Sequence, residues 1–130
     1  MAEDTSKQSF DVPEIDAETL AAWLAAPDPP LLLDVRNVDE QSLGVLPGAV
    51  SMPLSMLPER LDSIAGSAPR AIVLYCAAGF RSATGAQQLL RAGATRVHSL
   101  RGGFEEGQRL GLDCIVPSNA ECVALVAAQR

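Results

Sequence analysis

The sequence of 130 residues has few aromatic residues, few basic residues and no long hydrophobic run. Aromatic residues make up 4% of the chain, so a core has to be built from Leu, Val, Ile and Ala. The formal net charge is −6, which repels phosphate backbones and anionic lipid surfaces. We therefore expect no nucleic acid and no membrane among the partners. Because residues 1–8 are polar and no apolar stretch is long enough to span a bilayer, we expect a cytoplasmic location.

Cysteine and histidine are also scarce. The three cysteines, Cys76, Cys114 and Cys122, are an odd number without a CxxC pair, which fits neither a disulfide framework nor a thioredoxin-like motif. A zinc site would have to combine these distant cysteines with the single histidine, His98. We therefore expect no metal and no cofactor. Whether Cys114 or Cys122 has a redox role remains open, because a disulfide needs a specific separation of the two residues.

Two short apolar runs, at residues 31–35 and 71–75, are bounded by residues that break helices and are typical of strands buried on both faces. The intervening stretch 54–64 is predicted to be helical, as is 82–92, which Gly93 closes. This alternation of strands and helices indicates a parallel α/β sheet.

The ends of the chain complete this outline. Asp16 is the predicted N-cap of a helix that ends near Ala25, and residues 96–100 are a third candidate strand, followed by a turn into a helix near Phe104. The organisation we expect is a flexible arm at residues 1–8, one domain at residues 9–111 and an extension at residues 112–130. In that extension a short strand or loop precedes a helix packed on the domain.

The segment between the strand at 71–75 and the following helix contains the residues best suited to chemistry. It consists of Cys76, Ala77, Ala78, Gly79, Phe80, Arg81 and Ser82. Parallel α/β proteins bind ligands beyond the carboxyl ends of their strands, where backbone N–H groups and a helix N-terminus favour an anion. The same environment favours the thiolate form of a cysteine. Cys76 is therefore the predicted nucleophile, and residues 77–82 form the predicted anion-binding loop.

This loop, CAAGFRS, resembles the active-site loop of rhodanese-like domains. Three further segments resemble motifs of that family in the same order, namely DVR at residues 34–36 with Glu40 behind it, GVLPGA at residues 44–49 and LRGGFE at residues 100–105. The resemblance implies a five-stranded parallel sheet with helices on both faces. It also implies a thiosulfate sulfurtransferase-like enzyme, in which Cys76 accepts a sulfane sulfur as a persulfide and passes it to cyanide or a thiol.

The charges in and near the loop bear on the sulfur donor and on the residues that support the loop. Arg81 is the loop's one charged residue, so a thiol persulfide or a protein persulfide is as good a candidate donor as thiosulfate, and a sulfur-relay protein is a possible partner. We expect Asp34, Arg36 and Glu40 to support the loop rather than to take part in catalysis.

Two alternatives remain open. A rhodanese-like module without activity would serve protein binding or regulation. A cysteine phosphatase or arsenate reductase would have five residues between the cysteine and the arginine, whereas four separate Cys76 from Arg81.

Overall fold

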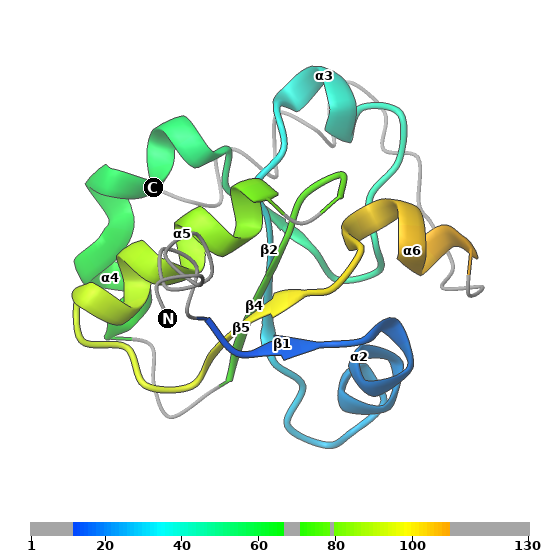
Figure 1. The fold of residues 1–130 in the computed structure, drawn as a ribbon, viewed down its shortest axis with the longest axis horizontal. Helices are drawn as coiled ribbons and strands as arrows, with labels where there is room; N and C mark the ends of the chain where they lie inside the picture. The colour runs from blue at the N-terminus through cyan, green and yellow to red at the C-terminus, as the bar shows by residue number, and fades with distance from the viewer. Residues whose placement is uncertain (1–11, 67–70, 79, 110–130) are drawn as a thin grey trace, which may run out of the picture.

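A five-stranded parallel sheet forms the centre of the fold in the computed structural model, which describes residues 12–66, 71–78 and 80–109. The strand order is β1-β5-β4-β2-β3, and every neighbouring pair is parallel (Figure 1). The bounds are β1 Glu14–Ile15, β2 Leu31–Asp34, β3 Val50–Ser51, β4 Ile72–Tyr75 and β5 Val97–Leu100. The predicted fold class, a five-stranded parallel α/β sheet flanked by helices, is confirmed. The expected arm at 1–8 and extension at 112–130 lie outside the described residues.

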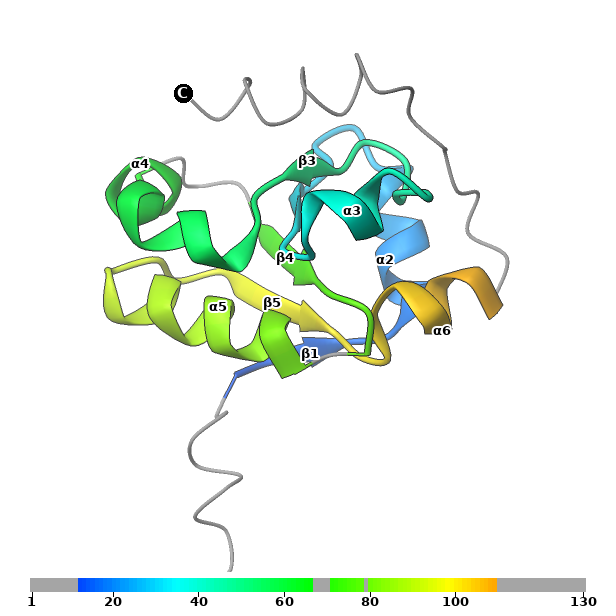
Figure 2. The same ribbon diagram turned by 90° about the horizontal axis from the view of Figure 1, so that it is seen from above.

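Helices lie on both faces of this sheet. The segments α4 (Leu61–Ala65) and α5 (Phe80–Arg91) lie on one side of the strands, and α2 (Ala17–Leu24) and α6 (Gly103–Arg109) lie on the other (Figures 1 and 2). The remaining segments are α3 (Val38–Gln41) and the 3₁₀ helix η2 (Leu54–Arg60). In the described part of the chain, no helix has the length and hydrophobicity needed to cross a membrane.

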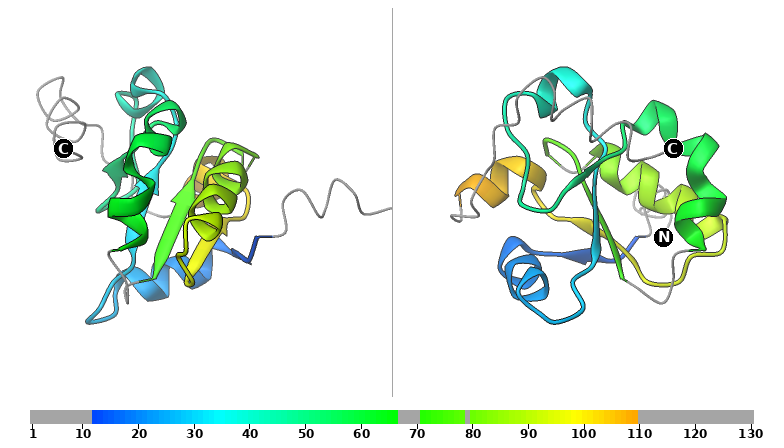
Figure 3. Two further views of the ribbon diagram at one scale, coloured as in Figure 1. Left: turned by 90° about the vertical axis from the view of Figure 1, so that its left-hand side faces the viewer. Right: turned by 180° about the vertical axis from the view of Figure 1, so that it is seen from behind.

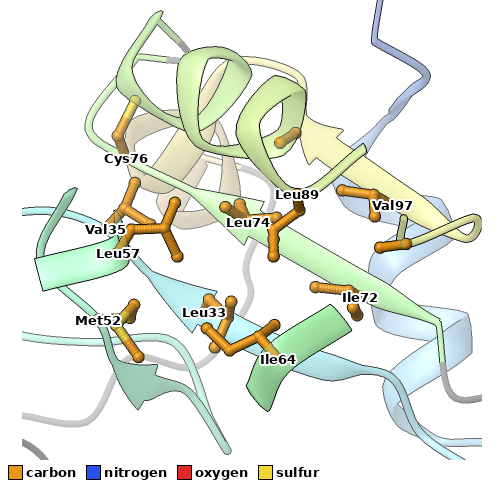
Figure 4. Close-up of a cluster of buried hydrophobic side chains, with 12 residues drawn as sticks. Leu33, Val35, Met52, Leu57, Ile64, Ile72, Leu74, Cys76, Leu89 and Val97 are labelled. Atoms are coloured by element: carbon orange, nitrogen blue, oxygen red, sulfur yellow. The ribbon is translucent and has the colours of Figure 1, made fainter. Parts of the chain in front are cut away.

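Alternating side chains of the strands fill two hydrophobic cores, one on each face. Ile72 and Leu74 of β4 belong to the core under α4 and α5, which Figure 4 shows, whereas Val73 and Tyr75 belong to the core under α2 and α6. Because both faces are covered, a central strand can be apolar at every position. This explains why the runs at residues 31–35 and 71–75 are continuous rather than alternating.

Local sequence accounts for most of the boundaries. The Asp16 side chain accepts a hydrogen bond from the N–H of Thr19 at 2.7 Å and begins α2 as predicted. The predicted helix at 54–64 is a 3₁₀ helix over most of its length, because Pro58 has no N–H to donate to an α-helical ladder. The helix predicted from residue 82 begins at Phe80, so Phe80, Arg81 and Ser82 belong to its first turn rather than to the loop.

The strand order changes direction at the carboxyl ends of β2 and β4. These two strands are neighbours, but β2 leads to β3 on one side and β4 leads to β5 on the other. The connections therefore diverge, which is where open parallel sheets bind ligands. Helix α3 lies at the same end of the sheet as the segment that follows β4 (Figure 3).

Candidate functional site

Cys76 is the first residue after β4, and its position suits a nucleophile held within the protein. Only 2% of its surface is exposed, and Figure 4 shows it at the margin of the core under α4 and α5, beyond the tip of β4. Helix α5 begins four residues later at Phe80. The N-terminus of a helix favours negative charge, which offsets part of the cost that burial imposes on a thiolate.

A buried pair of hydroxyl groups lies next to the Cys76 sulfur. The distance from Cys76 Sγ to Ser82 Oγ is 3.7 Å, and Ser82 Oγ lies 2.7 Å from Ser99 Oγ. Ser82 lies in the first turn of α5, Ser99 lies on β5, and both side chains are fully buried. The prediction singled out Ser82 from its motif but did not include Ser99, because a serine in a strand carries no sequence signal of its own.

Arg81 and Glu40 form a bidentate ion pair. Arg81 donates from Nη1 to Glu40 Oε1 at 2.8 Å and from Nη2 to Glu40 Oε2 at 2.9 Å. These bonds lower the pKa of Glu40 to about 2. They also raise the pKa of Arg81, to which the Cys76 sulfur adds a smaller contribution. The pair fastens α3 to the first turn of α5.

Asp34 and Arg36 form a separate, buried pair at the end of β2. Arg36 donates to both carboxylate oxygens of Asp34, with 2.8 Å between Arg36 Nη2 and Asp34 Oδ2. Burial lowers the pKa of Arg36, but the hydrogen bonds and charge of Asp34 outweigh it and raise the pKa overall. The Gln41 side-chain amide donates to the backbone carbonyls of both residues at 3.0 Å. Asp34 and Arg36 are thus bound to each other, whereas Glu40 is bound to Arg81.

The turn at Gly102 and Gly103 packs directly against the backbone of Cys76. The N–H of Phe104 donates to the carbonyl of Cys76 at 2.7 Å, and the N–H of Glu105 donates to that of Ala77 at 3.2 Å. A Cβ on Gly103 would lie 2.3 Å from the Cys76 oxygen, so only glycine fits. The glycine pair marked the turn in the sequence, but its contact with the cysteine depends on tertiary structure.

The aromatic ring of Phe104 joins this turn to the pair at the end of β2. The guanidinium carbon of Arg36 lies 4.1 Å from the centroid of the Phe104 ring, which is a cation–π distance. The Phe104 ring also stacks on Tyr75 with 6.2 Å between centroids. The Tyr75 hydroxyl accepts a hydrogen bond from the N–H of Leu46 at 2.9 Å. Arg36 after β2, Tyr75 at the end of β4 and Phe104 after β5 are therefore connected by direct contacts.

The other residues of the predicted loop differ in exposure. Ala77 is half-buried and Ala78 is exposed, while Phe80 is 76% exposed. Gly79 lies outside the described residues. His98 is on β5, opposite Val73 in the register, and its ring contacts Trp23 edge-on. Within the described ranges, no three His, Cys, Asp or Glu side chains are grouped so as to hold a metal ion.

The sequence profile of the rhodanese-like domain matches residues 16–110, and the chain belongs to this family. A protein of Allochromatium vinosum called a sulfurtransferase is 37% identical over 106 residues, which is 82% of this chain and 97% of that protein. A tRNA uridine(34) hydroxylase of Bordetella parapertussis is 34% identical over 89% of this chain, but this chain spans only 52% of that protein.

Solved structures show the same fold. The rhodanese-like domain of an Anabaena protein superposes with a TM-score of 0.68 at 29% identity, and the match covers 82% of this chain and 83% of the Anabaena chain. A thiosulfate sulfurtransferase of Pseudomonas aeruginosa superposes with a TM-score of 0.72 at 26% identity, and the match covers 97% of this chain and 25% of the Pseudomonas chain. The predicted family is thus confirmed.

Proposed function

We propose that the chain is a sulfurtransferase in which Cys76 carries a sulfane sulfur as a persulfide between a donor and a thiophilic acceptor. The observation that carries this proposal is the position of Cys76, buried after β4 and just before the N-terminus of α5. A relative called a sulfurtransferase, which this chain covers almost completely, supports it.

The transfer proceeds in two displacements. The Cys76 thiolate attacks the outer sulfur of the donor, a bond forms between the two sulfurs, and the donor's own bond to that sulfur breaks. With thiosulfate, sulfite leaves with the bonding electrons and Cys76 becomes a persulfide anion. Cyanide then attacks the terminal sulfur, which leaves as thiocyanate and restores the thiolate. A thiolate acceptor attacks the same atom and leaves as a new persulfide.

The ion pairs of the site favour a thiol persulfide over thiosulfate as the donor. Both terminal nitrogens of Arg81 are bonded to Glu40, and Arg36 is bonded to Asp34, so the charge of each arginine is already balanced. Thiosulfate is a dianion and gains most from an unbalanced cation, which neither arginine provides. The net charge of −6 opposes it further. A small thiol persulfide or the persulfide of a cytoplasmic relay protein suits these charges better.

The phosphatase alternative is disfavoured by the loop, since four residues between Cys76 and Arg81 form a smaller ring than the five that enclose a phosphate. Hydrolysis of aryl phosphates that depends on Cys76 would reverse this assignment.

Loading with sulfur tests the proposal directly. The full chain is incubated with glutathione persulfide or thiosulfate, the donor is removed, and intact mass and peptide mapping follow. We expect a gain of one sulfur on Cys76 that cyanide removes, and no gain in Cys76→Ser, because a hydroxyl is a far weaker nucleophile than a thiolate. Sulfur on Cys114 or Cys122 would contradict the assignment of the nucleophile. A failure of every donor would favour a binding module without catalysis.

A further inference from the structure

We propose that Ser99 is a positioning residue that acts on Cys76 through Ser82. Ser99 donates a hydrogen bond to Ser82, and the Ser82 hydroxyl in turn donates to the charged form of the Cys76 sulfur. This proposal deepens the function proposed above and rests on Cys76 as its nucleophile.

The three atoms form a short chain that joins three elements. It runs from Cys76 Sγ after β4, over 3.7 Å to Ser82 Oγ in the first turn of α5, and over 2.7 Å to Ser99 Oγ on β5. Both hydroxyl groups are fully buried, so in the described part of the protein each needs a partner inside the fold. The position of Ser99 is fixed by backbone pairing with β4 and β1, opposite Leu74 and Glu14.

The location of Ser99 is unusual for a hydroxyl. Side chains alternate along β5, so Ser99 lies on the same face as Val97, which belongs to the core under α4 and α5. An apolar residue could fill that position without a hydrogen-bond partner. The Ser99 hydroxyl contacts Ser82, which itself contacts Cys76.

The direction of the hydrogen bonds follows the charge of Cys76. When Cys76 is a thiol, its S–H donates to Ser82 and the Ser82 hydroxyl donates to Ser99. When Cys76 is a thiolate it only accepts, so the Ser82 hydroxyl turns to the sulfur and the Ser99 hydroxyl donates to Ser82. Successive donors polarise one another, which strengthens the bond to the charged sulfur. Without Ser99, the Ser82 hydroxyl loses the donor that holds it toward the sulfur.

Two substitutions that are isosteric with each other separate the hydroxyl from the packing. Ser99→Thr keeps the hydroxyl and adds a methyl group, and Ser99→Val has a second methyl group in place of that hydroxyl; both residues suit a strand. The measurement is the rate of Cys76 alkylation by iodoacetamide against pH, with the adduct mapped to Cys76. For Ser99→Val we expect alkylation about threefold slower than for Ser99→Thr below the midpoint of the profile, with the midpoint moved to higher pH. Ser99→Ala, which needs no extra space, should behave like Ser99→Val.

Substitution of Ser82 tests whether Ser99 acts through it. Ser82→Ala should slow alkylation about tenfold, the usual effect of losing one hydrogen bond to a charged group. Adding Ser99→Val or Ser99→Ala to Ser82→Ala should cause no further change. As a matched control, Ser51→Ala removes another buried hydroxyl, which donates to Gln41 Oε1 at 2.6 Å, and should leave the profile unchanged.

Three results would overturn the role of Ser99. They are equal profiles for Ser99→Thr and Ser99→Val, an effect of the Ser99 substitutions that persists in Ser82→Ala, and an equal shift in Ser51→Ala. Because alkylation needs no sulfur donor, this outcome is independent of the proposed function. If no donor loads the wild-type chain, sulfur transfer fails as the function, while the alkylation profiles still decide the role of Ser99.

Discussion

Replacing Gly103 by alanine should damage the site more than the same change at another glycine with a positive φ. The φ angle of Gly103 is +59°, and a Cβ there would lie 2.3 Å from the Cys76 oxygen and 2.7 Å from the Ala77 oxygen. At Gly48 the φ angle is +77°, but nothing lies within 4 Å of an added Cβ. Gly48→Ala is therefore a matched control that carries the backbone penalty without the contact.

The two substitutions differ by the free energy of the contact. A side chain at positive φ costs about 1 to 2 kcal/mol, and both variants share this penalty. They also share the loss of backbone freedom in the unfolded chain, which offsets about 0.4 to 1 kcal/mol. The contact at Gly103 involves backbone oxygens rather than a flexible side chain, so the chain has to move. Overpacking of this kind costs about 1 to 3 kcal/mol more.

Urea unfolding gives the free energy of unfolding of both variants, and sulfur loading reports on the site. We expect Gly103→Ala to lie about 1 to 3 kcal/mol below Gly48→Ala and to load sulfur more slowly, because the Cys76 carbonyl has to move away from Phe104. Gly48→Ala should load at the rate of the wild type. Equal stability and equal loading in the two variants would show that the turn does not position Cys76.

Further predictions concern the other contacts of the site. Glu40→Gln should lower the free energy of unfolding by only about 1 kcal/mol at neutral pH, because the side chains of Arg81 and Glu40 are 35% and 33% exposed. The same substitution should raise the rate of sulfur loading from thiosulfate relative to the rate from a thiol persulfide. The pKa of Glu40 is lowered from 4.5 to about 2, so this stabilisation should be present above about pH 4.5 and lost as the pH falls through about 2. Urea unfolding of Glu40→Gln and the wild type from pH 7 to 2 measures this loss. A difference between the two proteins that stays constant over this range would contradict the prediction. Tyr75→Phe leaves a buried N–H without its acceptor and should lower stability by about 1 to 3 kcal/mol in urea, whereas an unchanged midpoint would mean that the bond is replaced. Inserting one alanine before Phe80 should abolish sulfur loading, and full loading by that variant would show that loop length does not matter.

The fold could be predicted because its main signals are local. Asp16 caps its helix by contact with a residue three positions away, and the apolar runs mark strands covered on both faces. Two short elements were not predicted. Strand β3 has only Val50–Ser51 and α3 only Val38–Gln41, so neither is long enough to show a periodic pattern.

The site could be predicted only where its residues are close together in the sequence. Cys76, Arg81 and Ser82 share one segment, and their types and spacing indicate the chemistry. Ser99 and Gly103 come to Cys76 through the pairing of β5 with β4, a long-range arrangement that no local pattern encodes. The ion pair between Glu40 and Arg81 likewise joins residues far apart in the sequence.

Burial of the Cys76 sulfur has a consequence for its survival under oxidising conditions. Oxidation by peroxide to the irreversible sulfinic and sulfonic acids requires both thiolate character and exposure. The position of Cys76 before α5 favours thiolate character, whereas its exposure of 2% restricts the access of peroxide to the sulfur. In the proposed persulfide the reactive atom is the outer sulfur, one S–S bond of about 2.05 Å from the Cys76 sulfur. If Cys76 carries the proposed persulfide, we expect peroxide to oxidise the outer sulfur first, and a thiol reductant that cleaves the S–S bond would then restore the cysteine.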